Sequence, residues 1–334
     1  MDGFTLLKEL QQLIQETTTS PWADPRSAFD YLYQASIATC SRTGVLTGTQ
    51  SITTVSGTSS YTLNSNYIRM YLKDTNGRFI IKYTTAAGKV TFPHFVPYET
   101  IILGNYTSNV SVPNRFSITD ATVASLITST ATSAGAKTNT YTIWNQTIGE
   151  ATLTSSTSHF TGYANVGDPV NNVTDGSHGY IVALSSDTAV VTALFDGTDN
   201  DWTGSDVYII NPQLRFQIVL DPPPSASGDT VTVYYVKRDD PVYSVGRAYH
   251  LPSGYSPVLV HYAAWLYKYR DREPSFGDGF YRYWDHQCTV LENNMVNAKT
   301  GGVMLKHEMV AEELKKASAL ETQRAQAGMA RNRR

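Results

Sequence analysis

The chain combines helical sequence at both ends with a long intervening stretch of β-type sequence, and this order limits the folds open to it. Residues 255–298 carry apolar and aromatic side chains at the spacing of two dense amphipathic helices. Residues 44–236 are rich in Thr, Ser, Gly, Val and Tyr and hold few charges, which suits half-exposed strands. We therefore expect an α+β protein in which N- and C-terminal helices form a helical bundle beside a central antiparallel β-sheet. The order points away from a nucleotide-binding enzyme and toward a structural protein.

Local signals mark where the N-terminal helices begin and end. Residues 4–17 carry leucines and an isoleucine at helical spacing, which predicts a first helix. The pair Asp24 and Pro25 predicts the start of a second helix, because Asp accepts hydrogen bonds from free backbone amides and Pro fits the first turn. Gly44 is placed to end that helix.

Short strands separated by Gly, Asp and Asn turns fill the region between the helices. They begin near Ser51, and the last two, at 214–220 and 230–236, are expected to return to the first sheet as a hairpin around 222–228. Between these parts, residues 129–211 have the strand spacing of a small antiparallel barrel or sandwich. We expect this stretch to be an inserted β domain that projects outward.

These patterns divide the chain into three parts. Residues 1–128 and 212–300 would form a core of helices and sheet, residues 129–211 the inserted β domain, and residues 301–334 an extended C-terminal helix and tail. The helix of the last part has few apolar residues, and isolated helices are marginal in water. We expect it to become ordered on a partner.

Charge is sparse overall and uneven along the chain. Only 16% of the residues are charged and the formal net charge is −3, so the whole chain has no electrostatic attraction for nucleic acid. Residues 306–334 hold seven basic residues and four Glu, a net of +3, whereas residues 129–212 hold eight acids and one Lys, a net of −7. A basic tail on an acidic body predicts a tail that docks on another molecule.

The cysteines and the apolar segments bear on the cell compartment. Cys40 and Cys288 both fall in expected helices, and two cysteines at this spacing predict neither a disulfide framework nor a metal site. The sequence shows no apolar signal region and no apolar run of about 18 residues, the length that a membrane helix needs. We expect a protein made in the cytoplasm without a membrane segment.

One cluster of oxygen ligands is a candidate metal site. The stretch from 196 to 206 alternates acids with Gly, Asn and Ser, and its carboxylates are Asp196, Asp199, Asp201 and Asp206. Ca²⁺ takes six or more oxygen ligands, but the spacing is not that of an EF-hand, and Gly, Asp and Asn are also typical of a tight turn. We favour a plain loop. No nucleotide-binding loop or nucleophile elbow occurs in the sequence, and we expect neither catalytic residues nor a cofactor.

Aromatic residues gather beside an arginine in the second C-terminal helix. Tyr281, Tyr283 and Trp284 surround Arg282. Such a group suits stacking on single-stranded bases, and it also suits packing between helices or subunits, where Tyr, Trp and Arg are enriched. We favour an interface.

The layout resembles the head-to-tail adaptor (connector or neck) proteins of tailed bacteriophages. The resemblance lies in the N-terminal helix pair and in a few short segments, namely Tyr61-Thr-Leu63, Pro222-Pro-Pro224, Leu251-Pro-x-x-Tyr255, Val260-His-Tyr-Ala-Ala-Trp265, Phe280-Tyr-Arg-Tyr-Trp284 and Leu291. It covers about 1–104, 213–300 and the tail, and it rests on pattern and order. The insert is the main departure.

The resemblance implies a virion structural protein in the neck, between head and tail. Such adaptors form a closed ring, usually of twelve copies, beneath the portal protein; the ring extends the DNA channel and presents a surface to the next neck or tail protein. DNA passes through the lumen without sequence-specific binding. The resemblance implies that portal docking is carried by the C-terminal residues Met304, Met309, Val310, Leu314, Ala317, Leu320, Arg324, Arg331, Arg333 and Arg334. The helical bundle or subunit interface would use Phe29, Leu32, Tyr255, Leu259, Tyr262, Leu266, Phe276, Phe280, Trp284 and Leu291.

Two other functions stay open. The β domain at 129–211 suits a virion protein that binds carbohydrate or a receptor, and glycan binding by that domain would favour it. A cell-wall hydrolase associated with the neck is the other alternative, and it would need peptidoglycan cleavage that depends on one carboxylate. Neither alternative explains the terminal helices.

Overall fold

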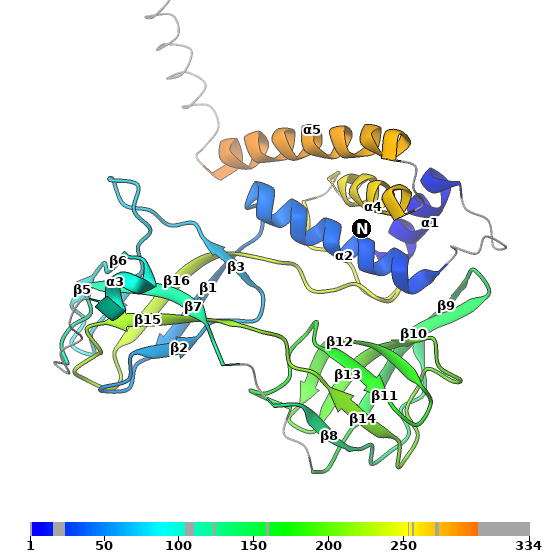
Figure 1. The fold of residues 1–334 in the computed structure, drawn as a ribbon, viewed down its shortest axis with the longest axis horizontal. Helices are drawn as coiled ribbons and strands as arrows, with labels where there is room; N and C mark the ends of the chain where they lie inside the picture. Colours follow the sequence, from blue (N-terminus) through cyan, green and yellow to red (C-terminus); the bar gives the residue numbers. More distant parts are fainter. Residues whose placement is uncertain are drawn as a thin grey trace, which may run out of the picture.

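The chain is an α+β protein with several largely antiparallel sheets and few helices, as the sequence predicts. The computed structural model describes residues 2–15, 24–103, 110–122, 125–157, 160–252, 254–255, 257–270 and 274–299. The long helices lie together along one side, and two separate groups of strands lie beneath them (Figure 1).

Four helices come from the two ends of the chain. They are α1 (Gly3–Ile14), α2 (Pro25–Thr43), α4 (Pro257–Arg270) and α5 (Pro274–Lys299), and a short helix, α3 (Tyr98–Leu103), lies among the strands. Helix α1 ends earlier than expected, because the residue that follows it, Gln15, adopts a left-handed conformation with φ 58°. No helix in the described part of the chain is long and apolar enough to cross a membrane.

The expected caps of α2 are confirmed. The carboxylate of Asp24 accepts hydrogen bonds from the backbone amides of Arg26 at 3.0 Å and Ser27 at 3.1 Å. Gly44 ends the helix with φ 62°, and its amide donates to the Cys40 carbonyl at 2.8 Å. These bonds satisfy donors and acceptors that a helix end leaves free.

Helices from opposite ends of the chain pack on one another. Helix α4 contacts α1, α2 and α5, and α2 also contacts α5. The Trp284 indole on α5 donates to the Thr39 hydroxyl on α2 at 3.0 Å, and Arg42 pairs with Glu292 at 2.8 Å. Their shared core includes Leu6, Leu10, Phe29, Leu32, Leu259, Ala263, Tyr267 and Leu291.

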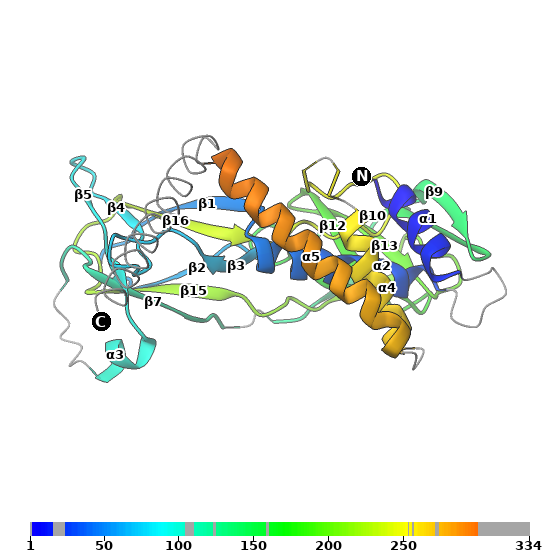
Figure 2. The same cartoon turned by 90° about the horizontal axis from the view of Figure 1, so that it is seen from above.

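Two sheets form a module beside the helices. The first sheet has the order β1 (Thr47–Thr53), β16 (Thr230–Lys237), β4 (Lys82–Thr84) and β5 (Val90–Thr91), with β3 (Tyr67–Met70) also paired to β16. The second has the order β2 (Ser60–Thr62), β15 (Phe216–Asp221), β7 (Arg115–Asp120) and β6 (His94–Phe95). Figure 2 shows the two sheets as separate layers. Their inward residues share one core, which includes Tyr83, Phe116, Leu220 and Val233.

The prediction of a hairpin around 222–228 is wrong. Strand β15 pairs with β2 and β7, whereas β16 pairs with β1, β3 and β4, so the two strands belong to different sheets. The connection crosses from one sheet to the other, and its proline-rich sequence resembles a hairpin turn only locally. The expectation of one central sheet is replaced by this pair of sheets.

The inserted stretch forms a third, seven-stranded sheet. Its order is β8 (Ile127–Thr130), β14 (Val207–Ile210), β11 (Pro169–Asn172), β12 (Ser177–Ser186), β13 (Ala189–Phe195), β10 (Gln146–Thr154) and β9 (Thr138–Ile143). Every pair in this sheet is antiparallel. One face covers a core of its own, which includes Leu153, Phe160, Trp202 and Tyr208.

The other face of this sheet packs against the helices, so the expectation that the insert projects outward is wrong. Along β13, Leu194 points into the core of the insert, whereas Ala193 and Phe195 join the core that the helices share. Phe195 lies 6.4 Å from Phe29 on α2 and 6.1 Å from Tyr243, measured between ring centroids. The physical reason is that successive side chains of a strand point to opposite faces, and both faces of β13 are apolar.

Candidate functional site

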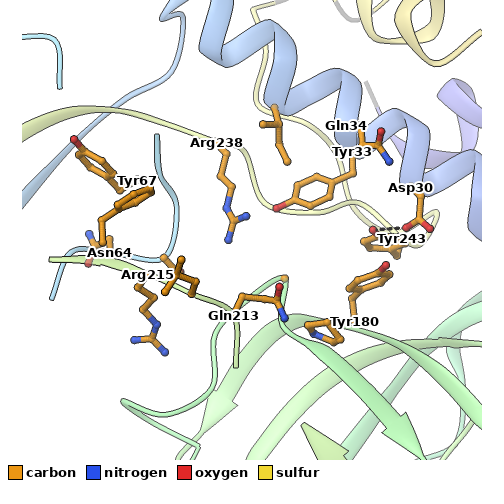
Figure 3. Close-up of a pocket in the computed structure, with 16 residues that line it drawn as sticks. Asp30, Tyr33, Gln34, Asn64, Tyr67, Tyr180, Gln213, Arg215, Arg238 and Tyr243 are labelled. Atoms are coloured by element: carbon orange, nitrogen blue, oxygen red, sulfur yellow. Dashed lines mark hydrogen bonds between the residues drawn. The ribbon is translucent and has the colours of Figure 1, made fainter. Parts of the chain in front are cut away.

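A pocket of about 520 Å³ opens where the helices, the two-sheet module and the insert meet. Helix α2 supplies one wall, the chain leading into β3 a second, and the insert a third (Figure 3). The lining includes the charged residues Asp30, Arg215 and Arg238 and the tyrosines Tyr33, Tyr180 and Tyr243. Ligand sites commonly lie at such junctions between structural units.

Arg238 is the cation of this pocket whose side chain has no partner among the described residues. It directly follows β16, and its backbone amide donates to the Asn66 carbonyl at 2.8 Å. Its guanidinium forms no hydrogen bond or ion pair with any residue that the structure describes. The adjacent carboxylate of Asp239 points elsewhere: it accepts from the His250 amide at 2.5 Å and pairs with the His250 ring at 2.7 Å.

Tyr33 and Arg238 share one corner of the pocket. The Tyr33 hydroxyl and Arg238 Nη2 lie 3.5 Å and 3.8 Å from the position that a Cβ on Gly167 would take. The Tyr33 hydroxyl oxygen is buried and has no hydrogen-bond partner among the described residues. Burial raises the pKa of Tyr33, while the charge of Arg238 opposes that rise. The corner is therefore polar and incompletely satisfied.

Asp30 on α2 is the one acid among the described residues that line the pocket, and it already has partners. The Tyr243 hydroxyl donates to its Oδ1 at 2.7 Å, and Arg26 Nε lies 3.9 Å from its Oδ2. The Tyr243 ring stacks on Tyr180 at 4.5 Å. Burial raises the pKa of Asp30, and burial together with the nearby Asp30 charge raises the pKa of Tyr243. This wall joins α2 to the insert.

Arg215 lies on the chain that returns from the insert to β15. Its Nη2 donates to the Tyr163 carbonyl at 3.2 Å. Asp168 fixes this chain, because its carboxylate accepts from the amide of Gln213 at 3.1 Å and from that of Asn165 at 2.8 Å. Burial raises the pKa of Asp168. The second arginine of the pocket is thus held in place, while Arg238 is not.

The carboxylates of the candidate metal site belong to Asp196, Asp199, Asp201 and Asp206. Asp196 points to Arg26 at 3.4 Å and to His178 at 3.3 Å. Within the described ranges, no three His, Cys, Asp or Glu side chains come together in a way that could hold a metal ion.

Asp206 has a structural role in its turn. Its carboxylate accepts from the amide and the hydroxyl of Thr203, both at 2.7 Å, and from the Asn172 side chain at 3.0 Å. Burial opposes ionisation, but these hydrogen bonds outweigh it and lower the pKa of Asp206. Its oxygens therefore hold the chain together at this turn.

Most of the expected interface residues serve packing within the chain. Those that are buried inside the helices are Phe29, Leu32, Leu259, Trp284 and Leu291, and those that are partly buried are Tyr255, Tyr262, Leu266 and Phe280. The side chain of Phe276 lies outside the described part. A side chain buried within one chain is not accessible to a second copy, so the first group accounts for helix packing alone.

Three tyrosines of the helical hairpin stay exposed. Tyr269, Tyr281 and Tyr283 are 64%, 40% and 45% exposed. Tyr281 lies 4.9 Å from Trp265, and Tyr283 stacks on His261 at 4.1 Å. Exposed tyrosines beside other rings are typical of surfaces that contact another protein. The ten expected portal-docking residues, all between 304 and 334, lie outside the described residues.

Sequence reasoning missed the pocket and Arg238. Tyr33, Gly167 and Arg238 come from three distant parts of the chain, and each is ordinary in its own segment. The sequence offered one indication of this site, a basic residue directly after a buried strand. Many such residues occur in proteins without a ligand site, so the indication becomes useful only when the fold is known. No protein-family model matches the sequence, and no curated protein matches it significantly.

Proposed function

We propose that this protein is a head-to-tail adaptor of a tailed bacteriophage, a virion structural protein of the neck. Copies would form a ring below the portal, continue the DNA channel and present a surface to the next neck or tail protein. The observation that carries the proposal is the joining of helices from both chain ends, where α4 packs on α1 and α2. This arrangement supports the resemblance that the order of segments suggests, which needs one group of helices made from both termini.

Two further features support a ring. The α4–α5 hairpin offers the exposed side chains of Tyr269, Tyr281 and Tyr283 for contact between copies. Helix α5 leads directly into the basic segment that would dock on the portal. In this proposal the four helices act as the adaptor's helical bundle, and residues 129–211 form a small barrel inserted into the adaptor core.

The test is the mass and shape of the full-length protein. Native mass measurement and negative-stain imaging are made on the purified chain, alone and with the portal protein of the same virus. We expect a ring with a central hole, usually of twelve copies, at least when the portal is present. A protein that stays monomeric in both conditions and does not bind the portal contradicts the proposal.

Two variants locate the docking segment. Replacing Arg324, Arg331, Arg333 and Arg334 by Gln should weaken portal binding, because Arg pairs well with carboxylates. Replacing Lys82 on β4 and Lys89 directly before β5 by Gln should leave portal binding unchanged. Equal binding by both variants would contradict docking through the C-terminal segment.

A further inference from the structure

The pocket at the junction of helices, sheets and insert holds a positive charge that no described residue pairs with. Arg238 has neither a hydrogen bond nor an ion pair through its guanidinium among the described residues. Figure 3 shows the guanidinium beside the Tyr33 hydroxyl and pointing toward Gln213. An arginine presents five donors in a fixed planar arrangement, which matches the oxygens of carboxylate and phosphate groups.

Three nearby carboxylates already have other partners. Asp30 accepts from Tyr243, Asp168 accepts from the amides of Gln213 and Asn165, and Asp239 binds His250. Two arginines and one acid line the pocket. Arg238 therefore forms an ion pair with none of these carboxylates, although the charges of Asp239 and Asp240 act in the same corner of the pocket.

We propose that this pocket is a binding site for an oxyanion, a carboxylate or phosphate group, with Arg238 as its main ligand. A volume of about 520 Å³ exceeds the needs of one inorganic ion. The rings of Tyr67 and Phe216, whose centroids lie 5.6 Å apart, form part of the lining and offer contact to the organic body that carries the anionic group. The site stands independently of the adaptor function.

Two sources supply this chemistry. One is a free small anion, and the other is an acidic side chain of a neighbouring copy. Both present the same oxygens to Arg238, so inorganic phosphate and citrate serve as probes for either source. The experiments below separate the two.

The first experiment measures anion binding to the full-length protein by calorimetry. Phosphate or citrate is titrated while chloride holds the ionic strength constant, since surface charges are screened by salt. We expect saturable binding of at least one probe. Arg238→Gln should weaken it by about tenfold or more, because hydrogen bonds to charged groups are the strong ones. Arg78→Gln removes the same charge from an exposed turn and should leave the affinity unchanged.

A second variant separates the effect of the positive charge from that of the guanidinium geometry. Arg238→Lys retains the charge but loses the planar pair of donors, and its affinity should lie between those of the wild type and Arg238→Gln. Equal melting temperatures of the three proteins without anion would show that the fold is intact. Absence of saturable binding for both probes, or unchanged binding in Arg238→Gln, overturns the proposal.

The second experiment identifies the source by measuring assembly in the presence of the bound probe. If the anion lowers the assembled fraction and Arg238→Gln assembles poorly, a neighbouring copy supplies the carboxylate. If assembly is unaffected, the natural ligand is a free anion. If the protein forms a ring but binds neither probe, the anion site is contradicted and the adaptor proposal is not. If the protein stays monomeric and binds a probe, the adaptor proposal is contradicted and the anion site is not.

Discussion

Arg247 binds both carboxylate oxygens of Glu150 and so ties the insert to the chain that leads into α4. Its Nε donates to Glu150 Oε1 at 2.7 Å, and its Nη2 donates to Oε2 at 3.0 Å. The Glu150 side chain is only 6% exposed, and the Ser244 hydroxyl also donates to it. Buried pairs of this geometry fix one arrangement of two segments, because an unpaired buried charge is costly.

Removal of the arginine from this pair should destabilise the protein strongly. Arg247→Ala leaves the Glu150 carboxylate buried with Ser244 as its remaining donor, and we expect a loss of about 3 kcal/mol in the free energy of unfolding. Urea denaturation of full-length variants measures it. The control is Arg42→Ala, which breaks the exposed pair with Glu292, in which the side chains are 42% and 43% exposed. That loss should be below about 1 kcal/mol, and equal losses in the two variants would contradict the structural role of Glu150.

Packing of the insert on the helices makes a second prediction. Phe195 is 2% exposed and lies between the insert and α2. Phe195→Ala should lower the free energy of unfolding by about 3–5 kcal/mol, because it leaves a cavity in a shared core. Leu184→Ala is the control on the neighbouring strand, where the side chain is 43% exposed, and its effect should be below about 1 kcal/mol. An insert that projected freely would leave the helices unaffected by either change, as amide exchange on α2 would show.

Features set by neighbouring residues were the ones that the sequence predicted well. Asp24 and Gly44 end α2 through bonds to residues within four positions along the chain, so local chemistry decides them. The apolar faces of the long helices were also predicted from the spacing of neighbouring residues. Trp284, Cys288 and Leu291 are all buried, as their helical spacing predicts.

Strand pairing depends on distant residues, and there the sequence was less informative. The turn residues between 222 and 228 suit a hairpin, but β15 and β16 pair with strands more than 100 residues away in some cases, such as Ser117 with Val219 and Thr49 with Tyr234. The run Ala189–Phe195 is apolar with one threonine, which is typical of a strand buried on both faces. An apolar run of this kind favours an insert that packs on another element. It is better evidence for where the insert lies than the fact that the insert interrupts the core segments in the sequence.

The ionised carboxylate of Asp206 should make the free energy of unfolding depend on pH in the acid range. Its pKa is lowered, so the ionised form contributes stability above about pH 4, the ordinary range for Asp, and this contribution is lost as the pH falls through the lowered pKa. Asp206→Asn should be less stable than the wild type at pH 7 by about 1–3 kcal/mol, because bonds to Thr203 and Asn172 are impaired.

The difference between wild type and Asp206→Asn should shrink as the pH is lowered below about 4. Denaturation midpoints at several pH values measure it. Asp199→Asn, in the exposed part of the same loop, should match the wild type at each pH. A difference that stays constant or grows in acid would contradict the role of the ionised carboxylate.

Both cysteines should be unreactive in the folded protein. Cys40 and Cys288 are 0% exposed, and burial raises the pKa of each thiol to about 12. At pH 8 only about one thiol in ten thousand would be ionised, and the thiolate is the reactive form. Dithionitrobenzoate should therefore label neither residue at pH 8 until denaturant is added, when both should react. Thr75→Cys places a thiol on an exposed turn and should react at once in the folded protein, which confirms that the reagent is active. Rapid labelling of the native wild type would mean that α2 or α5 opens readily, and it would contradict the close packing of helices from the two chain ends.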